Sequence, residues 1–197
     1  MVVAVYGSNL ANSTDTAAGH PLPYSLDGVS AAVNGIAAPI VYVSATQVNV
    51  QIPYEAGAGP AVLGIDNNGQ IAGIQLAISP SAPGVFADAN GNLYPTSTVA
   101  QGGMVTLYLA GAGEVSNQIP TGDAPSTATA SRYQPLSPVS VTVGGTEAFV
   151  LEMKLTANEV GTTQATILVP SSVPAGVQPV VVTIGGVSSP PVNVTVQ

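Results

Sequence analysis

Hydrophobic and polar residues alternate along short stretches of the chain, and turn-forming residues separate these stretches. The clearest case is QVNVQI at residues 47–52, where Val48, Val50 and Ile52 point to one side and the polar residues to the other. Pro53 ends the run, because a proline cannot donate a hydrogen bond to a strand ladder. The pattern predicts a strand with one face in a core.

Similar runs fill residues 29–78 and recur in residues 139–196. Asn34-Gly35 and Asn68-Gly69 supply the positive φ angles of two-residue hairpin turns. In the second stretch we expect strands over 139–143, 148–153, 163–169, 179–184 and 192–196. No segment keeps a period of 3.6 residues, so we expect no helix beyond a turn or two. The predicted fold class is all-β, built from antiparallel sandwiches.

The two stretches can be laid over each other. Asn34-Gly35 then matches Gly144-Gly145, Pro53 matches Pro170, and Tyr6 matches Tyr108. Two homologous units are the economical interpretation. We therefore expect a first domain at 1–80, a connector with a small hairpin at 81–102, and a second domain at 103–197. The long, proline-rich stretch 114–138 is predicted to be a functional or mobile loop.

Composition narrows the range of functions. Of 197 residues, 46% are hydrophobic and only 6% are charged, and the formal net charge is −8. Phosphate neutralisation therefore has almost no basic side chains to use, which argues against nucleic-acid partners. The short apolar runs argue against membrane insertion. There is no cysteine, so disulfides and thiolate chemistry are absent.

Several segments carry a family resemblance: VAVYGSNLA (3–11), VNGIAAPIVYVSATQVNVQIPYE (33–55), APGVF (82–86) and VPAGVQPVVVTIGGVSSPPVNVTV (173–196). They resemble immunoglobulin-like IPT/TIG repeats and, among these, the Solibacter-type C-terminal domain of secreted acidobacterial proteins. The resemblance implies two tandem immunoglobulin-like sandwiches with an accessory, noncatalytic surface role.

The chain departs from this family at two places. The apolar, proline-containing strand that usually precedes the YGSNL-type segment is missing, and EMKLTANEVGTT replaces the usual segment before ATILVP. Met1 leads directly into a strand and no signal peptide is visible, which suggests an excerpt of a longer polypeptide.

No set of residues predicts catalysis. His20 is the only histidine and lies in a Gly/Ala/Thr-rich loop without a nucleophile elbow. Glu147 and Glu152 are expected on opposite faces of a strand, so they make no glycosidase pair. Lys154 is expected to be solvated, with a lysine–asparagine isopeptide cross-link as the alternative. We predict no enzyme, no cofactor and no catalytic residues.

Two binding hypotheses stay open. The loops at Asp66 and Asp88 place oxygen ligands at alternate positions, which is the weak case for calcium, although Asn-Gly is also ordinary turn chemistry. Exposed tyrosine rings could contact glycans; the candidates are Tyr24, Tyr54, Tyr94 and Tyr133. Tyr6 and Tyr108 are instead expected in the core.

The preferred functional hypothesis is a structural or adhesive module of a secreted or cell-surface bacterial protein. Such a module acts as a spacer, a stalk or a contact surface for other domains of its polypeptide or for surface proteins. The alternatives are a carbohydrate-binding accessory module and a strand-exchange assembly subunit, in which an edge without its leading strand accepts one from a neighbour.

Overall fold

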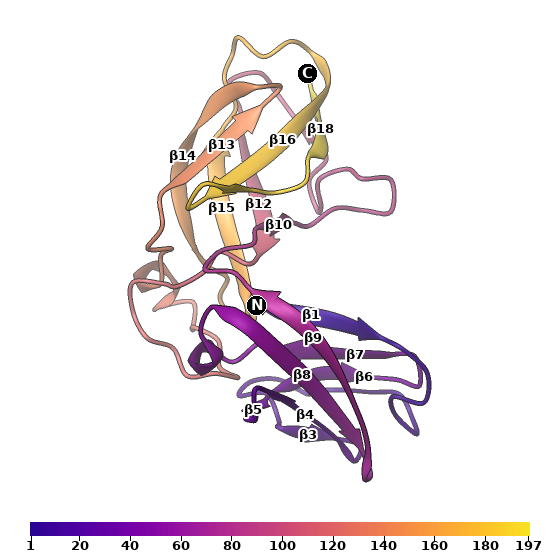
Figure 1. The fold of residues 1–197 in the computed structure, drawn as a ribbon. Helices are drawn as coiled ribbons and strands as arrows, with labels where there is room; N and C mark the ends of the chain where they lie inside the picture. Colours follow the sequence, from indigo (N-terminus) through magenta and orange to yellow (C-terminus); the bar gives the residue numbers. More distant parts are fainter. The chain divides into compact units, whose positions relative to one another are not determined.

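The computed structural model describes residues 1–197 and consists of strands with two single 3₁₀ turns (Figure 1). The chain forms two compact units. The first unit contains residues 1–80, 118–127 and 157–161, and the second contains 81–117, 128–156 and 162–197. The sequence predicts that each domain is one continuous stretch, 1–80 and 103–197, but each unit is built from three separate stretches. The expected connector, 81–102, belongs to the second unit.

The first unit has two sheets. Their strand orders are β1-β7-β6-β2 and β3-β4-β8-β9, with β5 beside β4. The elements are β1 (Val2–Tyr6), β2 (Asp15–Thr16), β3 (Ser25–Leu26), β4 (Val29–Val33), β5 (Ile36–Ala38), β6 (Ile40–Val43), β7 (Gln47–Gln51), η1 (Tyr54–Ala56), β8 (Gly59–Asn67) and β9 (Gln70–Ile78). In Figure 1 the long β8–β9 hairpin crosses in front of β7 and β6.

The core of the first unit lies between these sheets. Val48 and Val50 of β7 are completely buried, as their alternation predicts, and they share one hydrophobic cluster with Val29 and Leu63 from the other sheet. Asn49, the polar residue between them, faces outward, whereas Gln51 at the end of the strand is buried. Two antiparallel sheets with their apolar faces together make a β-sandwich.

Residues 118–127 complete the first unit by hydrogen bonds to its loops and to β7. The side-chain Oε1 of the buried Gln51 accepts a hydrogen bond from the Gly122 N–H at 2.7 Å. The Leu22 N–H donates to the Gly122 carbonyl at 2.7 Å. Thr121 Oγ donates to Glu55 and accepts from the Tyr54 N–H.

The second unit repeats this plan with additions. Its strand order is β10-β12-β15-β14-β13-β16-β18-β11, with β17 beside β16. The elements are β10 (Gly84–Val85), β11 (Thr98–Val99), β12 (Met104–Ala110), η2 (Ala130–Arg132), β13 (Val139–Val143), β14 (Thr146–Leu155), β15 (Thr162–Leu168), β16 (Gly176–Ile184), β17 (Val187–Ser188) and β18 (Val192–Val196). Strand β14 pairs with β13 near its start and with β15 further on, so it joins the two layers. In the first unit, Pro39 divides the corresponding strand into β5 and β6.

Equivalent strands pair in the same register in both units. Tyr6 lies opposite Gln47 in the first unit, and Tyr108 lies opposite Gln164 in the second. The hairpin β8–β9 runs without interruption, whereas Pro190-Pro191 separates β17 from β18 and the pairing with β16 shifts there by one residue. The pairings follow the sequence superposition at each of these strands.

Candidate functional site: tyrosine and amide faces

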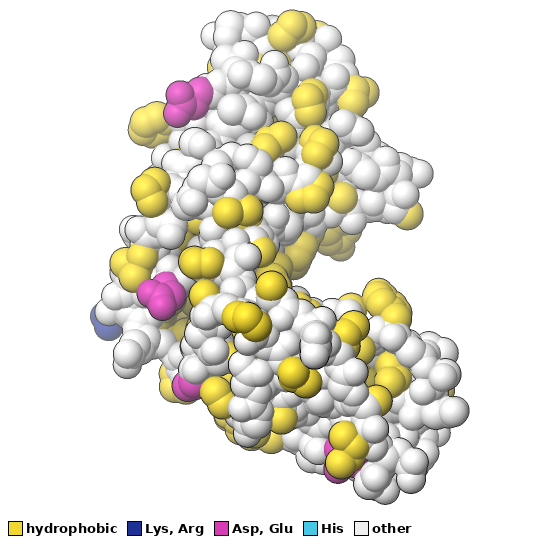
Figure 2. Space-filling model, in the orientation of Figure 1, with side chains coloured by type: hydrophobic (Ala, Val, Ile, Leu, Met, Phe, Trp, Pro, Cys, Tyr) yellow, Lys and Arg dark blue, Asp and Glu magenta, His cyan; other side chains and the backbone are white.

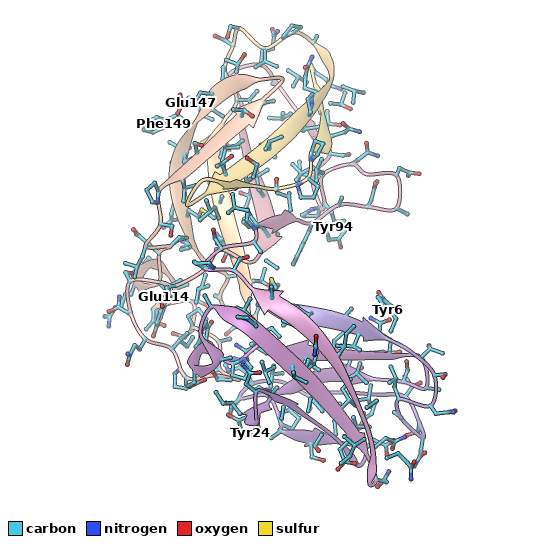
Figure 3. All side chains as sticks on the ribbon, viewed as in Figure 1. Tyr6, Tyr24, Tyr94, Glu114, Glu147 and Phe149 are labelled. Atoms are coloured by element: carbon cyan, nitrogen blue, oxygen red, sulfur yellow. The ribbon has the colours of Figure 1, made fainter.

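The four tyrosines predicted to contact glycans all lie outside the strands. Tyr54 is in η1, where burial, with a smaller contribution from the Glu55 carboxylate, raises the pKa of its phenol. Tyr24 and Tyr94 are exposed in connecting segments (Figure 3). Tyr133 follows η2 and is half-buried. The structure brings no two of them onto one sheet, so their role in glycan binding stays a prediction.

The prediction that Tyr6 lies in the core is wrong, because its side chain is 74% exposed. Val3 and Val5 are the inward-facing residues of β1, and alternation turns Tyr6 to the outer face (Figure 3). Tyr108, its counterpart on β12, is half-buried and also lies on the side away from the core residues Leu107 and Leu109.

Tyr6 belongs to an outer face made by β1, β7 and β6. Gln47 is its direct cross-strand partner, and Asn49 lies opposite Tyr42 of β6. Gln47 Nε2 donates to Asn49 Oδ1 at 2.8 Å, which orients both amides. We call Tyr6, Tyr42, Gln47 and Asn49 the tyrosine–amide face. It offers aromatic rings and uncharged donors and acceptors, groups that suit a neutral polyol.

The equivalent face of the second unit differs in charge and polarity. Gln164 lies between Tyr108 and Lys154 across three neighbouring strands. Lys154 Nζ lies 2.7 Å from Glu152 Oε2, so the lysine is paired on the sheet surface rather than free. Further along the same face, a cross-strand row of exposed apolar side chains comprises Met104, Leu168 and Phe149.

A β-bulge corrects the expectation for Glu147 and Glu152. The pairing with β15 shifts between Val150 and Glu152, which makes Leu151 an extra residue in β14. The extra residue returns Glu152 to the outward side, where Glu147 and Phe149 also lie (Figure 3). The two glutamates therefore share a face of the strand, but Glu152 is paired with Lys154.

The bulge also borders a solvent-open hollow of about 560 Å³ in the second unit. It is lined by Gln134, Pro135, Ser137, Val139, Val150, Leu151, Glu152 and Met153. Its single carboxylate is that of Glu152, so the hollow offers polar contacts and lacks the two acids of a glycosidase.

His20 forms a contact within the first unit. Its Nδ1 lies 2.9 Å from Asp123 Oδ1, and both side chains are partly exposed. Because Asp123 comes from the 118–127 segment, this pair adds to the contacts of Thr121 and Gly122 that hold the segment in place. The contact between His20 and Asp123 is thus explained by a structural role, which is to hold residues 118–127 against the loop that contains His20.

The two candidate calcium loops have the hydrogen bonds of tight turns. Asp66 Oδ1 accepts from the Gly69 N–H at 2.6 Å. The Asp88 carboxylate accepts from the N–H groups of Asn90 and Asn92 and from the Asn92 side chain, and these bonds lower its pKa. No group of three or more His, Cys, Asp or Glu side chains is placed to hold a metal ion.

The few charged side chains are scattered over the face shown in Figure 2, and the hydrophobic ones lie in small patches separated by backbone and other side chains. The chain contains no helix with the length and apolar character that a membrane span requires.

Together with the paired antiparallel sheets, the strand order and registers define the class: two immunoglobulin-like β-sandwich units.

No protein-family model matches the chain, and no curated protein is significantly similar to it. Among solved structures, it is similar to domains 4–9 of the surface layer protein SbsC, with 14% identity over 89% of this chain and 23% of that one at a TM-score of 0.28. It is also similar to the Bacteroides ovatus protein SGBP-B of a mixed-linkage glucan utilization locus, solved with a heptasaccharide (15% identity, 98% and 45% coverage, TM-score 0.31). A third is invasin, a bacterial integrin-binding protein (17%, 100% and 39%, TM-score 0.29). The chain spans less than half the length of each.

Proposed function

We propose that this chain is a noncatalytic, load-bearing spacer and contact module of a secreted or cell-surface bacterial protein, of the Solibacter-type family that its sequence resembles. The observation that carries the proposal is the parallel pairing of β11 with β18 in the second unit. We call this pairing the β11–β18 clamp.

The backbone bonds of the clamp are arranged to resist tension. The Thr195 N–H donates to the Ser97 carbonyl at 2.8 Å, the Gln197 N–H to Val99 at 2.9 Å, and the Gln101 N–H to Gln197 at 2.9 Å. Force entering ahead of β11 and leaving after β18 pulls two parallel strands at opposite ends. The bonds are then sheared together rather than opened one at a time, which suits a spacer under load.

Single-molecule stretching of the second unit tests this role. Because the chain has no cysteine, handles can be attached at Ala82→Cys and at an added C-terminal cysteine. Thr195→Pro removes the N–H that bonds Ser97 and should lower the unfolding force, since forced unfolding is governed by the unfolding barrier. Thr195→Ala keeps that N–H and should unfold at the unmodified force. Equal forces for the proline and alanine variants would contradict the proposal.

The tyrosine–amide face supports glycan binding as a second candidate. Tyr6 and Tyr42 supply rings, and Gln47 and Asn49 are held by their mutual hydrogen bond, so little ordering remains when a neutral glycan binds. On a glycan array, Tyr6→Ala and Gln47→Ala should lose any signal that the unmodified chain gives. Tyr94→Ala is the exposed-ring control. A signal lost with Tyr94→Ala and kept with Tyr6→Ala would transfer the site to the loop tyrosines.

A further inference from the structure

Strand β9 is an edge strand with one unpaired side. It pairs with β8 alone, over its whole length. The hairpin turn has φ angles of 51° at Asn68 and 90° at Gly69, which identifies a two-residue turn closed by the bonded pair Asn67 and Gln70. Alternation along an antiparallel ladder then directs the N–H and C=O groups of residues 71, 73, 75 and 77 to the open side.

The second unit shows what occupies the equivalent side of its own last strand. Asn193 of β18 donates its N–H to the Gly91 carbonyl and accepts from the Leu93 N–H. Thr195 donates to Ser97. Residues 91–101 thus cover the outer edge of β18, as an irregular stretch that ends in the parallel strand β11.

The registers identify the matching positions in β9. Val62 of β8 lies opposite Gln75, as Pro179 of β16 lies opposite Asn193. Two residues on, Ala77 corresponds in the same way to Thr195. The backbone groups that hold residues 91–101 in the second unit are therefore present, and unpaired, at Gln75 and Ala77.

The inward side chain next to this edge is more exposed in the first unit than in the second. Ile74 is 56% exposed on the inward side of β9, whereas its counterpart Val192 is 6% exposed. In the second unit, Leu93 and Val99 of the covering segment are themselves part of the hydrophobic core. The first unit has no equivalent of these two side chains beside Ile74.

Strand β1 shows the same difference. Val3 and Val5 are half-buried, whereas their counterparts Val105 and Leu107 are 3% and 0% exposed. Since β6 contacts β3 and β4 at one side of the sandwich, the opposite edges, β1 and β9, border the other side. In the second unit, the segment from β10 to β11 pairs first with β12 and then with β18, and so covers that side.

We propose that the open edge of β9 is a docking site for an extended segment of a second protein that adds to the sheet parallel to β9. The pattern of residues 91–101 defines the occupant: an uncharged strand with an apolar residue facing the space beside Ile74 and backbone groups bonding Gln75 and Ala77. Strand β9 has no charged side chain either, so no charge is buried unpaired. The site is separate from the β11–β18 clamp and does not depend on the load-bearing role.

The experiment uses a synthetic peptide of residues 91–101, GNLYPTSTVAQ, added to the whole protein and followed by amide hydrogen exchange. At a peptide concentration that occupies about nine-tenths of the sites, exchange at Gln75 and Ala77 should slow about tenfold. The same peptide with Leu93→Asp should give no protection, because Leu93 is the inward residue nearest the counterpart of Ile74 and the change would bury a charge there.

Proline variants locate the binding edge. Ala77→Pro removes an outward N–H that bonds nothing in the protein, so it should fold but lose peptide protection at Gln75. Ile71→Pro removes an outward N–H beyond the positions covered in the second unit and should keep that protection. Slow exchange at the buried Val50 amide verifies folding, and Gln75→Pro, read at Ala77, replaces Ala77→Pro if that variant is unfolded. No protection with millimolar peptide, protection at Thr195 alone, or equal binding by Ala77→Pro would overturn the proposal.

Discussion

Ser189 provides a direct test of how the second unit holds the shifted register of β18. Its N–H donates to the Val182 carbonyl at 2.8 Å, and its Oγ accepts from the Val182 N–H at 3.1 Å. Both residues are buried. Because Pro190-Pro191 interrupts the ladder, the hydroxyl replaces the backbone acceptor that an unbroken strand would offer to Val182.

Ser189→Ala should leave the Val182 N–H buried without an acceptor. The cost of such a group is about 1–3 kcal/mol, which corresponds to an amide exchange rate at Val182 that is about 5- to 150-fold faster. Measuring exchange at this amide, together with the urea midpoint of the second unit, separates the effect from any change in the first unit.

The neighbouring serine is the matched control. Ser188 Oγ lies 2.9 Å from Thr183 Oγ1 on the exposed side of the same hairpin. Its replacement by alanine should change stability by less than about 0.5 kcal/mol. If the two alanine variants have the same stability, or if Val182 exchanges at the unmodified rate in Ser189→Ala, the hydroxyl does not replace the missing acceptor.

Three further outcomes follow from the structure. Leu93→Ala should destabilise the second unit by about 2–5 kcal/mol, because Leu93 is buried in its core. The control Tyr94→Ala changes an exposed side chain and should cost less than about 0.5 kcal/mol, and urea unfolding measures both variants. Burial lowers the pKa of the Met1 α-amino group from 8.0 to about 6, so between these pH values the unfolded chain binds more protons than the folded chain. The free energy of unfolding should therefore rise from pH 6 to pH 8, by up to about 3 kcal/mol, and Nα-acetylation should abolish the rise. Calcium should leave the melting temperature unchanged because Asp66 and Asp88 hold their own turns; an increase that a chelator reverses would restore the ion-binding hypothesis.

Local patterns were sufficient for the strands and their pairing. Val48 and Val50 alternate with polar residues, and the positive-φ turns at Asn34-Gly35 and Asn68-Gly69 fix the register of their hairpins, so both features can be recognised from neighbouring residues. The expected orientation of a side chain, toward the core or toward the surface, is wrong where a shift of one residue along the strand decides which face it lies on. The apolar character of its strand favours the core for Tyr6, but Val3 and Val5 occupy the inward positions of β1 and leave Tyr6 on the outer face.

The features that sequence reasoning missed depend on distant residues. The bulge at Leu151 changes the side on which Glu152 lies, and no turn residue marks it. The bond from Gly122 to Gln51 joins positions far apart in the chain, although a glutamine at the end of an otherwise apolar alternation is a weak signal of a buried polar partner. The strand-exchange hypothesis expects an open edge, but only the strand order places one at β9, and only the burial of the two units shows that Ile74 is left exposed beside it.

The composition of the first unit from three stretches of chain has a consequence for biosynthesis. Residues 1–80 leave the ribosome early, but the pieces 118–127 and 157–161 that complete the unit emerge only after much of the second unit has been translated. Until residues 118–127 have been translated, Gln51 Oε1 lacks the hydrogen bond from the Gly122 N–H, and the first sandwich is incomplete. Both units therefore reach their final structure late in translation. A chain truncated after residue 80 would lack residues 118–127 and 157–161 of the first unit.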